Sequence, residues 1–327
     1  MDRNHNKPVV LYVVGYVRSG STLLDRLLGS IDGFHSCGEI FELWRQALDH
    51  RGPCSCGQHA EDCPFWAAVL EKTFDDAPSS LKSDVLKFAN LFYSTINKRN
   101  LVNLIFPRLR SQDFQTKLKD IEILIGKLYR AIAEVSDAQV IVDSSKYPLY
   151  AYLLSESNAV DLHLVHLVRD SRAVVYSHIR KKFVSEIGYT ATKKPFRTVL
   201  AWSLHNVLAE RLRANHRYVR VRYEDLAAHP KETILYIVET LGLAEKVGVD
   251  ESKLFASFSG ENKIVLGRGH LIAGNAMRFK HGEIKIKLDT EWKNSLPLLY
   301  KLAITVITAP LLKRYGYNIG LGTHNED

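Results

Sequence analysis

The sequence is poor in cysteine and methionine and has no long hydrophobic run. Four cysteines in 327 residues are too few for a scaffold built on disulfides. No stretch reaches the roughly 18 consecutive apolar residues that a membrane-spanning helix needs. The nearest candidate, 302–312, holds Pro310 between Lys301 and Lys313, a pattern that predicts a buried or interfacial helix. The N-terminal residues lack the small-residue cleavage site of a signal peptide, so we expect a soluble, cytoplasmic protein.

Positive charge is in excess along the chain. Lysine and arginine number 44 against 36 aspartate and glutamate residues, a formal net charge of +8. This excess favours anionic partners such as a nucleotide, a sulfated or phosphorylated ligand, a nucleic acid or a membrane surface. No recognisable nucleic-acid-binding motif is present, so we expect no nucleic-acid partner. Charge alone leaves one alternative open, a module that binds an anionic ligand without catalysis.

Apolar runs rich in β-branched residues alternate with helical patterns along the chain. Strands are predicted over 8–14, 140–142, 162–168 and 218–221, and helices begin near Ser21, Gly38, Ser171, Pro195 and Pro230. This alternation favours an α/β fold of three layers, with a doubly wound, mostly parallel sheet between helices. No linker divides the chain, so we expect one domain over 1–327. Residues 64–135 are predicted to be a helical insertion, and the polar, basic stretch 257–287 to be a long loop that acts as a lid.

A glycine-rich turn joins the first predicted strand to the helix that begins at Ser21. Gly15 and Gly20 allow backbone N–H groups to converge on an anion at the N-terminus of that helix. The spacing is P-loop-like, but Ser21 stands where an ATP- or GTP-binding loop has its lysine. The basic residue is instead Arg18, inside the loop, which suits a single phosphate better than a magnesium-bound triphosphate. An atypical P-loop kinase or NTPase is the alternative. Such an enzyme needs an acidic residue at the end of a strand to hold Mg²⁺, whereas the best candidate strand in this sequence ends at Arg169.

The same loop resembles that of the sulfotransferases that use 3′-phosphoadenosine 5′-phosphosulfate (PAPS), residue for residue over Val17–Leu24. A second resemblance lies at the end of a predicted strand, where Arg169 is followed eight positions later by Ser177. The resemblance implies that Arg18 holds the bridging oxygen and the 5′-phosphate of the donor, and that Arg169 and Ser177 hold its 3′-phosphate. It also implies backbone and hydroxyl contacts to the donor from the loop residues Ser19, Gly20, Ser21, Thr22 and Leu23.

Two further segments resemble parts of the same family. Residues 222–226 are similar to an Arg-Tyr-Glu-Asp-Leu segment whose tyrosine lies near the nucleotide, which points to Tyr223. The stretch 269–280 is similar to the basic C-terminal segment that closes over the 3′-phosphate, and implies donor contacts from Asn275 and Arg278. The family implies PAPS as cosubstrate, 3′,5′-ADP as product and no metal.

Sulfuryl transfer to a hydroxyl needs a general base for the acceptor proton and positive charge at the leaving phosphate. Arg18 is expected to supply the positive charge at the leaving phosphate. Lys146 follows a predicted strand that ends at the same edge of the sheet, so it is expected to reach the sulfuryl oxygens. Cys37–Glu39 resembles a segment of the tyrosylprotein sulfotransferases, and the closest branch is that of carbohydrate and tyrosylprotein enzymes. Glu39 is therefore the expected base and His35 the second candidate. Carbohydrate, lipid, peptide and small alcohol all remain open as the hydroxyl-bearing acceptor, and the oligomeric state is open too.

Three of the four cysteines, Cys54, Cys56 and Cys63, fall within ten positions, with His59 among them. Four such ligands can hold a structural zinc ion. The Cys-x-Cys spacing differs from the Cys-x-x-Cys of common zinc fingers. A disulfide, or simple thiols in a loop near the acceptor entrance, is therefore the favoured interpretation, and no metal is expected.

Overall fold

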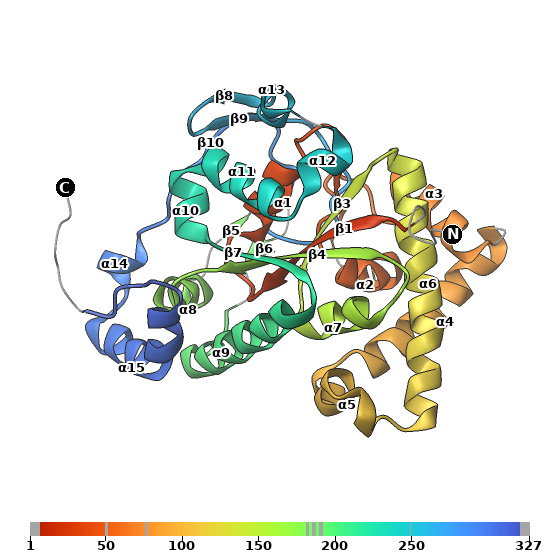
Figure 1. The fold of residues 1–327 in the computed structure, drawn as a ribbon, viewed down its shortest axis with the longest axis horizontal. Coiled ribbons are helices and arrows are strands. Elements are labelled where there is room, and N and C mark those ends of the chain that lie inside the picture. The colour runs from red at the N-terminus through yellow and green to blue at the C-terminus, as the bar shows by residue number, and fades with distance from the viewer. Residues whose placement is uncertain are drawn as a thin grey trace.

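The computed structural model of the chain describes residues 7–49, 52–75, 78–180, 183–184, 188–189, 192–248 and 250–320. Its central sheet has five strands, and every neighbouring pair in it is parallel (Figure 1). In spatial order the strands are β2 (Phe34–Ser36), β3 (Val140–Lys146), β1 (Val9–Gly15), β4 (Asp161–Val168) and β7 (Arg217–Arg222). The predicted α/β class with a parallel sheet is therefore confirmed.

Helices cover both faces of this sheet because successive strand residues point to opposite sides. In β1, Val10 and Tyr12 join one core while Leu11 and Val13 join the other. The first core is covered by α2 (Leu43–Asp49), α3 (Pro64–Phe74), α4 (Pro78–Thr95), α5 (Leu101–Ile105), α6 (Gln112–Ser136), α7 (Pro148–Glu156) and α9 (Pro195–Arg211). The second is covered by α1 (Ser21–Leu28), α10 (Tyr223–Ala228), α11 (Pro230–Thr240), α12 (Leu243–Val247) and α13 (Glu251–Leu254). Figure 1 shows α1 and α11 on one side of the sheet and α7 and α9 on the other, which confirms the three layers.

Between β2 and β3, the segment predicted to be a helical insertion forms the helices α3 to α6. New helical segments begin at Pro64, Pro78 and Pro107. Proline suits these positions because the first residues of a helix need no N–H donor, whereas inside a helix the missing donor would break the hydrogen-bond ladder.

The stretch 257–287 differs from the predicted loop, because it contains a small antiparallel sheet. Its strands are β8 (Phe258–Gly260), β9 (Lys263–Leu266) and β10 (Gly282–Lys285). Ile264, Leu266 and Ile286 are buried against the core on the α1 side of the main sheet. The alternation of isoleucine with lysine over 283–287 is a period-two signal that indicates a strand, and the sequence prediction missed it.

Two further strand assignments differ from the prediction. The short edge strand β2 was not predicted, and β3 runs past Val142 to Lys146. The polar end of β3 can lie inside the protein because its side chains are hydrogen-bonded: Asp143 accepts from the hydroxyl groups of Tyr129 and Ser145. A separate antiparallel pair is formed by β5 (Phe183–Val184) and β6 (Gly188–Tyr189).

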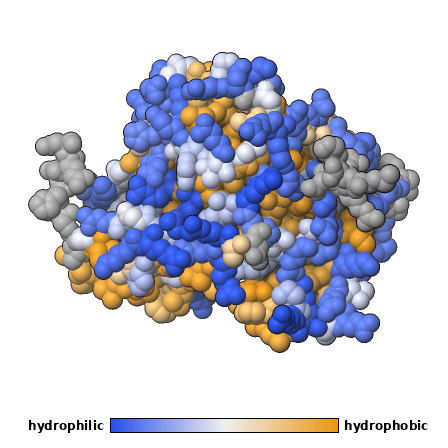
Figure 2. Space-filling view, in the orientation of Figure 1, coloured by the Kyte–Doolittle hydropathy of each residue, from blue (hydrophilic) through white to orange (hydrophobic). Residues whose placement is uncertain are grey.

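The apolar C-terminal segment forms α15 (Leu298–Arg314), which packs against α8 (Ser171–Ile179), as does α14 (Trp292–Ser295). Ile304 and Leu312 are buried, whereas Val306 is 74% exposed. Figure 2 shows apolar side chains gathered at this end of the molecule, in the region of α15 in Figure 1. The helix is thus buried on one side only. No helix within the described residues is both long and apolar enough to cross a membrane.

Candidate active site

The loop between β1 and α1 requires glycine at two points. Gly15 (φ 152°) and Gly20 (φ 91°) have positive φ, and a Cβ atom on Gly20 would lie 2.3 Å from the ring of Tyr223. The N–H groups of Leu23 and Leu24 donate to the Gly20 carbonyl at 3.0 and 3.1 Å, so the helix begins directly at the loop. The predicted strand–loop–helix unit is therefore present, at the carboxyl end of the central strand, and Tyr223 packs against its second glycine.

Three arginines converge beside this loop. Arg18 Nε donates to Ser177 Oγ at 2.9 Å, and Arg169 donates to the Arg18 carbonyl at 3.1 Å. The Arg169 guanidinium lies 4.2 Å from the centre of the Tyr223 ring. Burial lowers the pKa of the Arg18 guanidinium, and the positive charges of Arg169 and Arg180 lower it further. The crowding of positive charge favours an anion at this place.

Two acidic residues offset part of this charge, and the sequence analysis did not single them out. Asp289 accepts from Arg169 at 3.1 Å, and Glu291 forms an ion pair with Arg180. Both carboxylates come from the segment that leads into α14. The side chain of Asp289 is one-third exposed, so it lies at the solvent side of this pair.

Glu39 and Lys146 form an ion pair. Lys146 Nζ lies 2.6 Å from Glu39 Oε1, and the two side chains are 6% and 17% exposed, the lysine being the more buried. Lys146 ends β3 and also donates to the Ser144 carbonyl at 2.9 Å. The Glu39 N–H donates to the Ile272 carbonyl at 2.7 Å. The segment after β2, the end of β3 and the segment after β9 thus meet around this carboxylate.

Arg18 and Lys146 share an unusual backbone conformation. Their φ angles are 71° and 65°, in the left-handed region that residues with a Cβ rarely adopt. Such a conformation costs on the order of 1–3 kcal/mol, and it clusters at functional sites. The fold holds both basic side chains in place in spite of this strain.

One cavity of about 1080 Å³ brings most of the predicted site residues together. The predicted residues that line it are Arg18, Gly20, Ser21, Thr22, Leu23, Glu39, Lys146, Arg169, Ser177, Tyr223 and Asn275. It is also lined by residues that the sequence analysis did not assign to the site, among them Arg180, Phe183, Met277, Lys285, Lys287, Asp289 and Glu291. The two lysines belong to the isoleucine–lysine alternation, so recognition of that strand would have pointed to them.

Ser19, Arg278 and His35, all predicted for the site, are not among the lining residues. Arg278 is buried and donates to the carbonyls of Gly274 at 2.6 Å and Pro53 at 3.4 Å. It therefore fastens the segment after β9 to the loop before α3. The His35 ring stacks on Phe65 with 4.7 Å between centroids, and burial lowers its pKa to about 4. The structure does not bring the side chain of Arg278 or His35 to the cavity.

Two buried polar atoms beside the loop have no hydrogen-bond partner within the described part of the chain. They are Ser19 Oγ and Arg169 Nε, on side chains that are 1% and 6% exposed. A buried polar group left without a partner costs stability. Together with the glycine loop and the arginines, these atoms fit a bound group that is rich in hydrogen-bond acceptors, such as a phosphate.

The cysteine cluster has a different histidine from the one that the sequence suggested. Cys54, Cys56 and Cys63 lie with His270, and the sulfur and ring nitrogen atoms of the four side chains are all within 4.8 Å of one another. His59 does not belong to this group. The cysteines are free thiols, with 3.8 Å between the sulfurs of Cys54 and Cys63, so the structure has no disulfide here.

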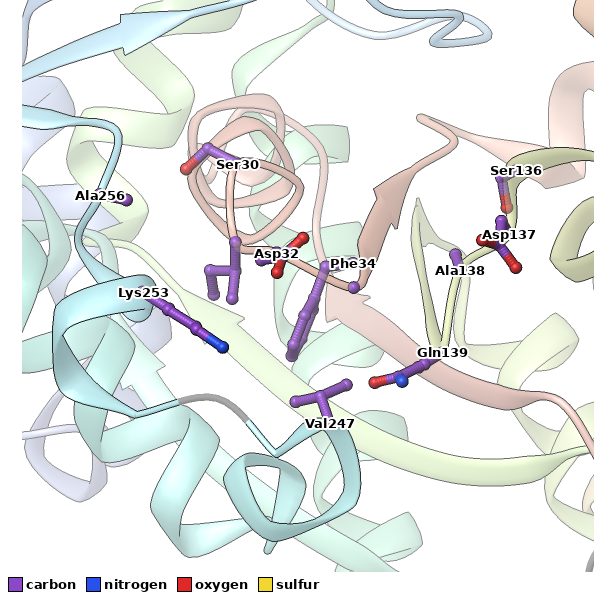
Figure 3. A pocket seen from close by; sticks show the side chains of 12 residues that line it. Ser30, Asp32, Phe34, Ser136, Asp137, Ala138, Gln139, Val247, Lys253 and Ala256 are labelled. Atoms are coloured by element: carbon purple, nitrogen blue, oxygen red, sulfur yellow. The ribbon is translucent and has the colours of Figure 1, made fainter.

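A second cavity, of about 750 Å³, lies near the amino ends of β2 and β3 (Figure 3). The side chains of Phe34, Gln139, Val247 and Lys253 point toward it. It contains none of the predicted site residues. In open α/β sheets ligands bind at the carboxyl ends of the strands, so the candidate site is the cavity beside the glycine loop.

Below that loop, Asp25 on α1 is fully buried, and burial raises the pKa of its carboxyl group to about 7, while a hydrogen bond from Ser144 lowers it in part. The folded protein therefore keeps a proton that an unfolded aspartate, with a pKa of about 3.9, releases. Stability from this group is present at acid pH and falls as pH rises from about 4 to about 7.

We expect Asp25→Asn, which cannot titrate, to gain about 2–3 kcal/mol of unfolding free energy relative to wild type between pH 5 and pH 8. Urea unfolding of both proteins at the two pH values measures this difference. Other buried groups, such as Asp143 with its pKa of about 6, change the unfolding free energy of both proteins with pH in the same way. Their contribution therefore cancels in the difference between variant and wild type. A difference that stays constant with pH would contradict the assignment.

The parallel sheet, the glycine loop at the end of its central strand and the basic cavity beside it define an α/β protein with a P-loop-like site. More particularly, the model of the sulfotransferase family matches residues 8–246. The chain belongs to the sulfotransferase family, which confirms the resemblance seen in its loop. Its branch within the family stays a prediction.

Two solved structures are similar over nearly the whole chain. The sulfotransferase domain from the Synechococcus PCC 7002 olefin synthase has 20% identity and a TM-score of 0.54, and the match covers 97% of this chain and 98% of that one. The sulfotransferase domain from the curacin biosynthetic pathway has 14% identity and a TM-score of 0.53, over 96% and 100% of the two chains. At these identities the likeness is one of fold. No curated protein matches the sequence.

Proposed function

We propose that this protein transfers a sulfuryl group from PAPS to the hydroxyl group of an acceptor. The observation that carries the proposal is the convergence, in one cavity, of the glycine loop, Arg18, Arg169 and the Glu39–Lys146 pair. Membership of the sulfotransferase family supports the type of reaction. The loop and the arginines support a donor that carries phosphate groups.

Donor binding is assigned to the loop and to the helix after β4. Arg18 and the backbone N–H groups of the loop would hold the 5′-phosphate, at the N-terminus of α1. Arg169 and Ser177 would hold the 3′-phosphate, and Ser177 already accepts a hydrogen bond from Arg18. Asn275 would add a contact from the C-terminal segment, which its N–H ties to Thr22 Oγ1 at 3.1 Å.

Catalysis is assigned to Glu39, Lys146 and Arg18. When bound, PAPS supplies an activated sulfuryl group. Glu39 would accept the proton of the acceptor hydroxyl, and Lys146, 2.6 Å away, would orient the carboxylate and add positive charge near the reacting oxygens. Arg18 would stabilise the charge that develops on the leaving phosphate. His35 is less suited to act as base, because it does not line the cavity.

The donor assignment is tested by thermal unfolding in the presence of 3′,5′-ADP, 5′-AMP or ATP without added metal, and of ATP with Mg²⁺ for comparison. A ligand at 100 times its Kd stabilises the folded state by about 2.7 kcal/mol, which raises Tm measurably. We expect the largest rise with 3′,5′-ADP, because Arg169 and Ser177 recognise its second phosphate.

ATP with Mg²⁺ as the better ligand would instead support the kinase or NTPase alternative and overturn the proposal. Binding of 3′,5′-ADP without any transfer from labelled PAPS to a panel of sugar, lipid, tyrosyl-peptide and alcohol acceptors would favour a binding module. Transfer to one member of that panel identifies the acceptor class.

A further inference from the structure

The three clustered cysteines precede α3, and the histidine beside them comes from a distant part of the chain, between β9 and β10. We propose that Cys54, Cys56, Cys63 and His270 bind a structural zinc ion, which joins the loop before α3 to the segment that follows β9. The proposed sulfuryl transfer does not use this site, and the inference stands independently of it.

The distances within the cluster are near those of a tetrahedral zinc site. His270 Nδ1 lies 3.1 Å from Cys63 Sγ and 4.0 Å from Cys54 Sγ, and the two sulfurs are 3.8 Å apart. With zinc bonds of about 2.3 Å to sulfur and about 2.0–2.1 Å to nitrogen, neighbouring ligand atoms lie about 3.5–3.8 Å apart. Small adjustments of these side chains would therefore place all four ligand atoms around one ion.

The ligand types select zinc among the common metals. Three thiols and one imidazole form a soft to borderline set, which suits Zn²⁺ and excludes Mg²⁺ and Ca²⁺, because those ions prefer oxygen. Four protein ligands leave no open coordination position, which is typical of structural rather than catalytic zinc. The three thiols would bind as thiolates and release their protons to water.

The surroundings of the sulfurs support thiolate ligands. Cys63 directly precedes the first turn of α3, where the helix dipole favours negative charge. The Trp66 indole N–H donates to the His270 carbonyl at 2.6 Å, which fixes the backbone of the fourth ligand.

The two ligand-bearing segments are already joined by other contacts. The Ser55 hydroxyl donates to the Gly269 carbonyl at 2.7 Å and accepts from the Leu271 N–H at 2.8 Å. The Phe65 ring stacks on the imidazole of His270, with 5.2 Å between centroids and 13° between planes. The position of His270 is thus set by packing on several sides, so the ligand set is organised before an ion binds.

Zinc at this place would hold a segment that continues directly into the active site. Two residues after His270, Ile272 accepts from the Glu39 N–H at 2.7 Å. Three residues further, the Asn275 N–H donates to Thr22 Oγ1 in the glycine loop at 3.1 Å. The ion would therefore hold in place the segment that hydrogen-bonds to the expected base and to the donor loop, without contacting either of them.

The test begins with the metal content of the tag-free full-length protein, purified under reducing conditions. Inductively coupled plasma mass spectrometry should find about one zinc per chain, as in other closed four-ligand sites. Protein from cells grown in minimal medium with cobalt should show the visible absorption of tetrahedral Co²⁺ together with ultraviolet charge-transfer bands from thiolates.

Variants then identify the ligands. Cys63→Ser and His270→Ala should each lower zinc affinity at least ~10-fold, because loss of a direct ligand exceeds the loss of a supporting contact. His270→Cys should keep zinc and strengthen the cobalt charge-transfer bands, since it supplies a fourth thiolate. This variant keeps the test decisive even if the other two fold poorly. Matched controls are His59→Ala and Cys37→Ser, a histidine and a cysteine outside the cluster, which should both keep full zinc content.

Three results would overturn the proposal. The reduced wild-type protein could lack zinc and fail to develop cobalt bands. His59→Ala could lose the metal while His270→Ala retains it, which would refute the ligand set. Intact mass under non-reducing conditions could show a disulfide between Cys54 and Cys63 in the native protein. None of these measurements depends on sulfotransferase activity, so their failure leaves the proposed reaction untouched.

Discussion

Glu39→Gln should leave donor binding intact and lower kcat by about 10²–10⁴-fold. The amide cannot accept the proton of the acceptor hydroxyl, but it keeps the size of the side chain and can still accept a hydrogen bond from Lys146, now 2.6 Å from Oε1. Steady-state rates at saturating PAPS measure the loss, and calorimetric titration with 3′,5′-ADP measures donor binding.

The matched control is Glu42→Gln, three positions further along the chain. Glu42 pairs with Arg45 at 2.9 Å and does not line the cavity, so this variant should keep the wild-type rate. His35→Ala distinguishes the second candidate for the base, and we expect only a mild effect. An inactive His35→Ala together with a fully active Glu39→Gln would assign the base to His35. Full activity of both variants would place the base elsewhere.

Arg169→Ala should weaken the binding of 3′,5′-ADP by about 10- to 150-fold and leave 5′-AMP binding nearly unchanged. Loss of a charge-assisted hydrogen bond costs about 1.5–3 kcal/mol, and only the 3′-phosphate is assigned to this guanidinium. Calorimetric titration with both nucleotides gives the comparison. Two features support a phosphate contact here: Arg169 Nε has no hydrogen-bond partner among the described residues, and the Asp289 that pairs with this guanidinium is partly exposed.

Arg222→Ala provides the control for the loss of a positive charge. Arg222 ends β7, pairs with Asp225 at 2.6 Å and does not line the cavity. It should bind both nucleotides as the wild type does. If Arg169→Ala weakened the binding of both nucleotides equally, the role of the arginine would be to stabilise the conformation of the loop, through its hydrogen bond to the Arg18 carbonyl at 3.1 Å. That result would remove its assignment to the 3′-phosphate.

Most of the fold could be predicted because it rests on patterns of short range. The runs that became β1 and β4 are apolar, rich in valine or leucine, and bounded by glycine or charge, and such runs are typical of buried strands. Five helices (α3, α4, α7, α9 and α11) begin at a proline, and α1 begins directly after the glycine loop; at these points the backbone itself limits the choice of conformation. The small sheet of β8, β9 and β10 was missed because its strands are only three or four residues long.

The candidate site could be predicted in part. The carboxyl ends of parallel strands meet at one edge of a sheet, so the sequence places Arg18, Lys146 and Arg169 at the same edge. It does not say which side chains at that edge touch. The Glu39–Lys146 pair and the position of Arg278 behind the cavity depend on how segments after different strands pack together.

The cysteine cluster shows most clearly which features can be predicted from the sequence and which depend on the tertiary structure. The sequence by itself determined the parallel sheet, the glycine loop and the gathering of Cys54, Cys56 and Cys63, because these features depend on neighbouring residues. Only the tertiary structure decided that His270, 207 positions from Cys63, and not the nearby His59, completes the cluster. Local periodicity fixes which face a residue occupies, whereas contacts between distant segments follow from the packing of whole elements, which no short stretch of sequence contains.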